Sequence, residues 1–174
     1  MLADIDLKDS FVKIFTGIRR SGKSTLMLQL ARQQKQFSTI NFEDPRLSQF
    51  EVNDFFKLEK IFHTEGNKPV YFFDEIQNVK GWEKFIRILH DKKTKVVLSG
   101  SNASLLSIEL GSSLTGRQIT YEVFPFSYSE FLNHTNLKSG LESFQEYLDI
   151  GGFPEFITTR KTEILTQLYN DLIY

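Results

Sequence analysis

With 174 residues, the chain is long enough for one domain with a substantial hydrophobic core. Hydrophobic residues (40%) and charged residues (25%) are close to the averages of globular proteins, which argues against a wholly disordered or fibrous chain. A net charge of −1 gives no overall basic field, so the composition offers no positive argument for a nucleic-acid partner.

Strand and helix patterns alternate along most of the chain. Residues 11–16 form a short apolar run that predicts a strand, and from Lys23 the apolar residues take helical spacing. Further strands are predicted at residues 37–42, 70–73, 96–98 and 119–124, and further helices at residues 51–63, 82–89 and 103–110. The 70–73 run is apolar throughout, as in strands buried on both faces of a parallel sheet. The alternation predicts an α/β fold with a five-stranded, mainly parallel sheet flanked by helices.

After residue 126 the pattern is helical to the end. Apolar residues still recur with helical period at Tyr174, and no glycine or proline stop signal comes shortly before it. We therefore expect two parts, a core at residues 1–126 and a helical extension at residues 127–174. The extension is expected to be the start of a longer lid or C-terminal region.

The segment between the first strand and the first helix has the spacing of a phosphate-binding P-loop, or Walker A sequence. Gly17 and Gly22 allow the backbone to bend so that its N–H groups point inward at phosphate oxygens, where the positive end of the following helix is also directed. Lys23 is expected to reach the β- and γ-phosphates, and Ser24 to place a hydroxyl on magnesium. The sequence therefore predicts a site for Mg²⁺ and ATP, or less favourably GTP.

The whole loop and the start of the helix are predicted to contact the nucleotide. The predicted cofactor-binding residues are Gly17, Ile18, Arg19, Arg20, Ser21, Gly22, Lys23, Ser24 and Thr25. The two arginines are open to a second interpretation, because exposed arginines on a loop are commonly solvated and contribute little.

An acidic pair follows the apolar 70–73 strand and resembles a Walker B sequence. Asp74 lies where a P-loop protein needs a carboxylate to hold magnesium, typically through water. Glu75 can orient and deprotonate the water that attacks the γ-phosphate, which favours a hydrolase over a small-molecule kinase. The alternative is that the pair is only the polar end of a strand or a helix cap.

Other polar residues near strand ends are weaker candidates. Asn102, or Ser101 beside it, could sense the γ-phosphate or could equally cap the next helix. Glu43 and Asp44 end the second predicted strand, and one of them could face the same cleft, although turn residues are the simpler interpretation. Arg117 could stabilise the transition state in a neighbouring subunit of a homo-oligomer, or could be an ordinary surface arginine.

Several motifs together resemble the AAA-type ATPases of bacteria and archaea in which an ATPase module precedes a C-terminal domain of uncertain function. The motifs lie at residues 17–25, 41–44, 72–77, 98–102, 114–117, 124–131 and 151–155. The resemblance implies an additional-strand fold, in which strand 96–99 lies between the P-loop strand and the strand that ends at Asp74. It also implies a further C-terminal domain, which could bind a protein or nucleic-acid partner.

The expected location follows from what the chain lacks. Cysteine is absent, which excludes disulfides and cysteine nucleophiles and fits a reducing cytoplasm. Residues 1–6 are acidic where a signal peptide needs a basic start, and no segment approaches the roughly 20 apolar residues of a membrane span. We expect a soluble cytoplasmic protein.

Two functions remain open at this point. The first is Mg²⁺-dependent ATP hydrolysis, with Lys23, Glu75, Asn102 and Arg117 as the catalytic residues and with Ser24 and Asp74 as the metal ligands. The second is a nucleotide-dependent switch that regulates a partner with little hydrolysis of its own. No guanine-reading Asn-Lys-x-Asp sequence occurs, which favours ATP.

Overall fold

The computed structural model describes residues 5–62, 69–101 and 116–173. The chain forms two compact units. The first comprises Met1–Thr16 and Lys23–Glu122, and the second comprises Gly17–Gly22 and Val123–Tyr174. The predicted P-loop therefore begins within the second unit and ends in the first, at the start of a helix.

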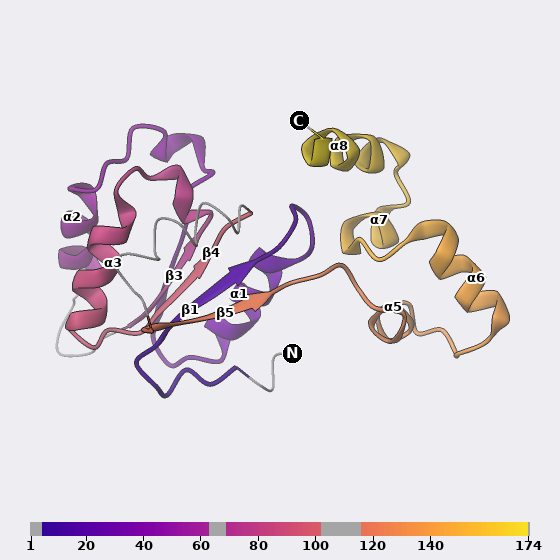
Figure 1. The fold of residues 1–174 in the computed structure, drawn as a ribbon, viewed down its shortest axis with the longest axis horizontal. Coiled ribbons are helices and arrows are strands. Elements are labelled where there is room, and N and C mark those ends of the chain that lie inside the picture. The colour runs from indigo at the N-terminus through magenta and orange to yellow at the C-terminus, as the bar shows by residue number, and fades with distance from the viewer. Residues whose placement is uncertain (1–4, 63–68, 102–115, 174) are drawn as a thin grey trace. The chain divides into compact units, whose positions relative to one another are not determined.

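A five-stranded parallel sheet is the centre of the first unit (Figure 1). Its strands are β1 (Val12–Thr16), β2 (Phe37–Asn41), β3 (Val70–Asp74), β4 (Val96–Ser99) and β5 (Gln118–Glu122). Their order is β2-β3-β4-β1-β5, so β4 lies between β1 and β3. This order confirms the predicted α/β fold and its additional strand.

Helices cover both faces of this sheet (Figure 1). In β3, Tyr71 and Phe73 belong to the core that also contains residues of α2 (Asp54–Phe62) and α3 (Trp82–Asp91). Because side chains alternate along a strand, Phe72 faces the other way. On that side α1 (Lys23–Arg32) packs against β2, β3 and β4. Two short 3₁₀ helices, η2 (Pro45–Leu47) and η3 (Ile76–Asn78), follow β2 and β3.

Phenylalanine rings fill the core between the sheet and α2. Phe55 is completely buried, stacks on Phe85 with ring centroids 4.5 Å apart, and contacts Phe42 and Phe73 edge-on. This packing explains the aromatic-rich composition of the chain.

Truncation of Phe55 tests this packing. We expect Phe55→Ala to lower the free energy of unfolding by about 3–5 kcal/mol, because it removes a buried ring and leaves a cavity. Urea unfolding of Phe56→Ala is the matched control, since the neighbouring ring is 40% exposed. Equal losses in the two variants would contradict a core centred on Phe55.

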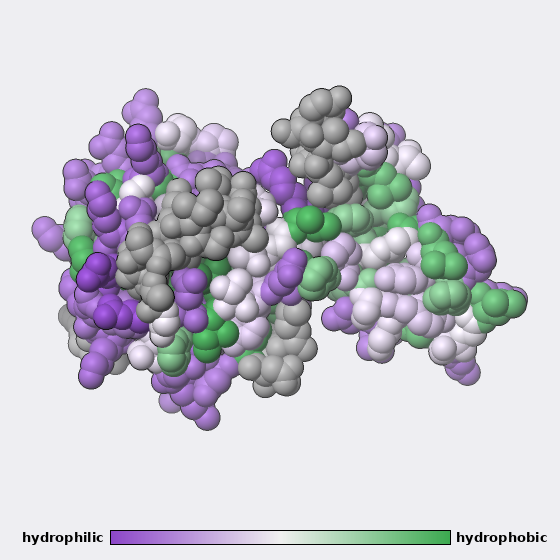
Figure 2. Space-filling model, viewed as in Figure 1, coloured by the Kyte–Doolittle hydropathy of each residue, from purple (hydrophilic) through white to green (hydrophobic). Residues whose placement is uncertain are grey.

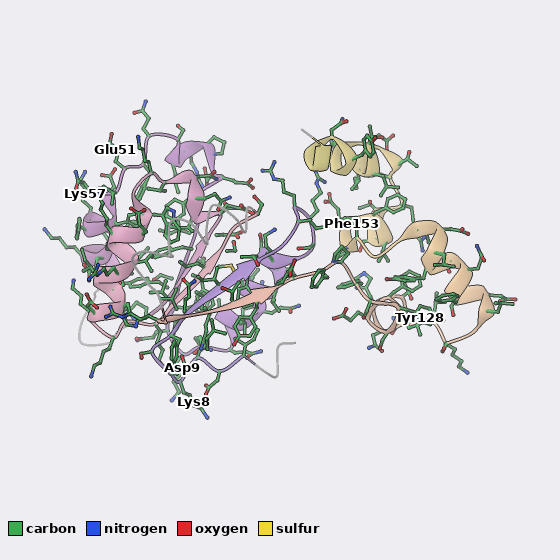
Figure 3. The ribbon with its side chains drawn as sticks, viewed as in Figure 1. Lys8, Asp9, Glu51, Lys57, Tyr128 and Phe153 are labelled. Atoms are coloured by element: carbon green, nitrogen blue, oxygen red, sulfur yellow. The ribbon has the colours of Figure 1, made fainter. Side chains whose placement is uncertain are left out.

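The second unit is helical beyond β5. It contains α5 (Tyr128–Thr135), α6 (Leu141–Ile150), α7 (Pro154–Thr159) and α8 (Thr162–Ile173). A capping box formed by Ser127 and Glu130 starts α5, and the hydroxyl of Tyr128, labelled in Figure 3, lies 2.8 Å from that of Ser143 in α6. The predicted helix at residues 103–110 lies outside the described residues.

Helix α6 exposes apolar side chains along one face. Leu141, Phe144 and Leu148 are 84%, 43% and 59% exposed, and their spacing of three and four places them on the same side of a helix. Figure 2 shows hydrophobic surface over this helix. No helix in the described part of the chain is long and apolar enough to cross a membrane.

Candidate phosphate-binding site

The loop between β1 and α1 has a backbone that requires glycine at its first position. Gly17 has φ of 135°, and a Cβ atom there would lie only 2.2 Å from the carbonyl oxygen of Val123. A side chain at this position would therefore be strained in its backbone and would collide with fixed backbone atoms. Gly22, at the other end of the loop, also has a positive φ, of 102°.

Within the loop, the described side chains differ in exposure. Ile18 is half-buried and Arg19 is exposed. The Ser21 N–H donates to the Ile18 carbonyl (3.3 Å), while the Ser21 hydroxyl is buried without a hydrogen-bond partner among residues 5–62, 69–101 and 116–173. A buried hydroxyl in this setting is a candidate donor for a phosphate oxygen.

Helix α1 begins at Lys23, directly after the loop. The Lys23 side chain is 3% exposed, and its Nζ lies 4.0 Å from Oε1 of Glu75. No acidic residue occupies the first turn of α1, so the positive end of the helix has no carboxylate of its own helix to offset it. Ser24 and Thr25 are exposed in the same turn. This end of α1 is therefore suited to an anion.

The acidic pair lies at the carboxyl end of β3. Asp74 is the last residue of the strand, and Glu75 follows it in the left-handed conformation with φ of 51° and ψ of 48°. For a residue other than glycine this conformation costs about 1–3 kcal/mol, and such strain clusters at functional sites. Five residues other than glycine have positive φ in the described part of the chain, so this strain supports a functional role for Glu75 only together with its position beside Lys23.

Hydrogen bonds fix both carboxylates. The fully buried hydroxyl of Ser99, the last residue of the adjacent strand β4, donates to Asp74 and accepts from the Glu75 N–H (3.1 Å). Oε2 of Glu75 accepts from the side-chain amide of Gln77 (2.5 Å) and from the N–H of Ser101 (3.1 Å). Five residues from the ends of two neighbouring strands thus form one polar network.

No sequence pattern predicts a role for Ser99 or Gln77. A polar residue that ends an apolar strand was the available signal for Ser99, and Gln77 belongs to a motif that was noted only as part of a resemblance. Ser101 contacts Glu75 through its backbone N–H, and Asn102 lies outside the described residues.

Removal of the Ser99 hydroxyl has a defined expected effect. We expect Ser99→Ala to lower the free energy of unfolding by about 1–3 kcal/mol, because it leaves the N–H of Glu75 and an oxygen of Asp74 without their buried partner. Denaturant unfolding of Ser101→Ala serves as the control, since among residues 5–62, 69–101 and 116–173 that hydroxyl accepts a single hydrogen bond, of 3.3 Å, from Gln77. A larger loss in Ser101→Ala would contradict the importance of the Ser99 hydroxyl.

The acidic residues after β2 have a local structural role. The Asp44 carboxylate caps η2 by accepting from the N–H of Arg46 (2.9 Å) and also accepts from its guanidinium (2.6 Å). The bond from the Arg46 side chain lowers the pKa of Asp44 from 3.8 to about 2. Glu43 is exposed, and its N–H donates to the side chain of Asn41. These contacts favour the interpretation of both as turn residues.

Arg117 lies at the opposite end of the sheet from the acidic pair. It precedes β5, and its carbonyl accepts from the N–H of Val12 at the start of β1. The length of β1, roughly 13 Å, therefore separates it from the edge where Asp74 lies. Its guanidinium is 3.4 Å from Asp91. Arg117 is thus placed away from the site of its own chain.

The donor set fits magnesium better than a metal that needs a full protein cage. No group of three or more His, Cys, Asp or Glu side chains that could hold a metal occurs within the described ranges. Magnesium usually keeps several waters and takes one or two protein oxygens together with substrate phosphates. Asp74 and Ser24 can supply such oxygens.

Comparison with known families decides the broad identity. A family model for the AAA domain matches residues 9–132. The chain belongs to the AAA domain family. The match runs from just before β1, through the P-loop and both acidic residues, into α5.

The chain is also similar to curated relatives, and its fold is similar to solved structures. An uncharacterized protein of Methanocaldococcus jannaschii is 33% identical over 98% of this chain, and one of Haemophilus influenzae is 34% identical over 97%. This AAA domain chain spans 43% and 47% of those relatives. The fold is similar to AMPPCP-bound DnaA from Aquifex aeolicus (TM-score 0.57, 14% identity, 98% of this chain and 60% of that one). It also resembles C. elegans PCH-2 (TM-score 0.50, 15% identity, 86% of this chain and 44% of that one).

Proposed function

We propose that this AAA domain binds ATP with Mg²⁺ and hydrolyses the bond between the β- and γ-phosphates. The observation that carries the proposal is the buried Lys23 ammonium, 4.0 Å from the Glu75 carboxylate at the carboxyl edge of the sheet. A cation that can hold phosphates and a carboxylate that can accept a proton are thereby brought together.

The residues of the candidate site have separate roles in this reaction. The backbone N–H groups of the loop and Lys23 hold the phosphates, and Ser24 and Asp74 hold the magnesium ion. When bound, that ion neutralises charge that develops on the phosphate oxygens. Ser99 fixes the Asp74 carboxylate in the orientation in which it can serve as a ligand.

Glu75 is the general base. It accepts the proton of a water molecule whose oxygen bonds to the γ-phosphorus, and the bond from that phosphorus to the bridging oxygen breaks. Orthophosphate and ADP leave. Asn102 is proposed to sense the γ-phosphate, and Arg117 to act on the nucleotide of a neighbouring subunit in a homo-oligomer. The cytoplasm is the proposed location, since the chain has no cysteine.

Phosphate release in the presence of ATP tests this function. We expect turnover with Mg²⁺, loss of turnover when EDTA removes the metal, and a weaker response to GTP. Because Arg117 is proposed to act between subunits, turnover per chain should rise with protein concentration. No ATP binding by calorimetry at millimolar nucleotide would rule the proposal out.

A nucleotide-dependent switch is the second candidate function. The hydrogen bonds that Gln77 and Ser101 donate to Oε2 of Glu75 favour it, since they occupy one of the two carboxylate oxygens that could take the proton of water. Tight ATP binding with negligible phosphate release, in a chain that reaches the length of the relatives, would support the switch over the hydrolase.

A further inference from the structure

Two motifs that the proposed chemistry does not use meet in the second unit. One is the pair of arginines in the P-loop, and the other is the Gly-Gly-Phe-Pro-Glu run at residues 151–155. Nη1 of Arg20 lies 2.7 Å from Oε2 of Glu155 in α7, and Nη2 lies 2.9 Å from Oε1 of Gln167 in α8. The guanidinium thus bridges two helices from a position inside the loop.

The loop backbone lies against the same part of the second unit. Gly22 approaches the ring of Pro154, since a Cβ on the glycine would lie 3.9 Å from the proline Cγ. Pro154 is the first residue of α7, after Phe153, which Figure 3 labels. Gly17 passes the carbonyl of Val123 closely, as described above. The beginning, the middle and the end of the loop therefore lie close to residues 123–167 of the same unit.

The backbone conformation of Arg20 is consistent with a side chain that is held by its contacts with α7 and α8. Its φ of 61° is left-handed, and a local turn alone does not favour that conformation in arginine. The side chains of Arg20 and Glu155 are 30% and 46% exposed, and a single ion pair that is exposed to this extent usually contributes little to stability. Here one planar guanidinium has two acceptors on two helices, an arrangement whose geometry only arginine matches.

We infer that Arg20 is a positioning residue that fixes the P-loop on α7 and α8 through Glu155 and Gln167, and is not a ligand of the phosphates. The inference rests on the proposed nucleotide binding. A loop already held in its binding conformation loses less conformational entropy when phosphates bind. The affinity of the loop for ATP therefore depends on contacts made by α7 and α8.

A double-mutant cycle separates this role from direct phosphate binding. We expect Arg20→Ala and Glu155→Ala each to raise the Kd for ATP by about 3- to 10-fold, and the double variant to bind ATP no more weakly than Arg20→Ala alone, which already removes both bonds of the guanidinium. The exchange Arg20→Glu with Glu155→Arg should restore part of the loss. If Arg20 instead binds phosphate, Glu155→Ala will leave the affinity unchanged or tighten it, and that result would overturn the inference.

A second arginine in the same unit is the matched control. Arg160 is also left-handed, with φ of 58°, and pairs with Glu146 at 2.6 Å, but it lies outside the loop. Arg160→Ala leaves both acceptors of Arg20 in place, so it should change the Kd for ATP much less than Arg20→Ala does. An equal weakening in Arg160→Ala would overturn the inference, because it would show a general effect of the unit's stability.

Hydrogen exchange of the nucleotide-free protein gives a readout that does not depend on ATP. Arg20→Ala should speed exchange of the amides of α7 and of the loop, and unchanged exchange would overturn the inference. If the unmodified chain binds no ATP, the proposed function fails, whereas faster exchange would still support the contact between loop and helices. The two failures are therefore distinguishable.

Discussion

Replacement of Glu75 by glutamine is expected to lower ATP turnover by about 10²- to 10⁴-fold, the contribution of a positioned general base, with ATP binding retained. Glutamine has nearly the same shape, and its amide oxygen can still accept the N–H of Ser101 that Glu75 accepts at 3.1 Å. It cannot take a proton from water at neutral pH. The measurement is phosphate release, with calorimetric ATP binding beside it.

A second buried glutamate provides the matched control for this experiment. Glu59 is 9% exposed, lies in α2, and pairs with Lys92 at 2.7 Å. Glu59→Gln makes the same chemical change to a lysine-paired carboxylate that has no part in the site, so turnover should be unchanged. Undiminished turnover in the Glu75→Gln variant would remove the proposed base from the mechanism.

Much of the fold was predictable because its signals are local. Strand-like runs of three to six residues that alternate with helical spacing predict strands and helices, and the wholly apolar 70–73 run indicates a parallel sheet. The position of β4 between β1 and β3 followed from the family resemblance, since no single segment encodes strand order. Strand β5 ends at Glu122, two residues before the predicted end, and Pro125 soon after it has no N–H to donate.

The candidate site was predictable only where one motif carries the chemistry. The spacing of Gly17, Gly22 and Lys23 is a local pattern, and the pattern identified them. The contacts of Ser99 and Gln77 with the acidic pair depend instead on which strands are neighbours and on the left-handed backbone of Glu75. These contacts depend on the tertiary structure, so the periodicity of the sequence does not predict them.

Contacts between residues that are far apart in the sequence are also not predictable from local patterns. Arg20 and Glu155 are 135 residues apart in the chain, so neither could be assigned the other as a partner from spacing. For Arg117, only the parallel register of β5 with β1 shows that it lies at the opposite end of the sheet from Asp74. Its proposed action on a neighbouring subunit stays a prediction.

A large loss of ATP affinity is expected for Lys23→Ala. We expect the affinity for ATP to fall by about 100-fold or more, because the variant loses charge-assisted hydrogen bonds to two phosphates, each worth about 1.5–3 kcal/mol. Isothermal calorimetry measures this loss. Lys92→Ala is the matched control, since Lys92 also pairs with a buried glutamate, Glu59, but outside the site. It should bind ATP normally.

A loss of binding in Lys23→Ala could also come from misfolding, since the variant leaves the carboxylate of Glu75, whose side chain is 8% exposed, without its cation. An unpaired buried charge destabilises a protein by several kcal/mol. The double variant Lys23→Ala with Glu75→Gln removes both charges and should regain the unfolding free energy lost in the single variant. If Lys23 holds phosphate, the double variant will fold and still fail to bind ATP. Recovery of ATP binding together with stability would instead show that Lys23 only balances the charge of Glu75.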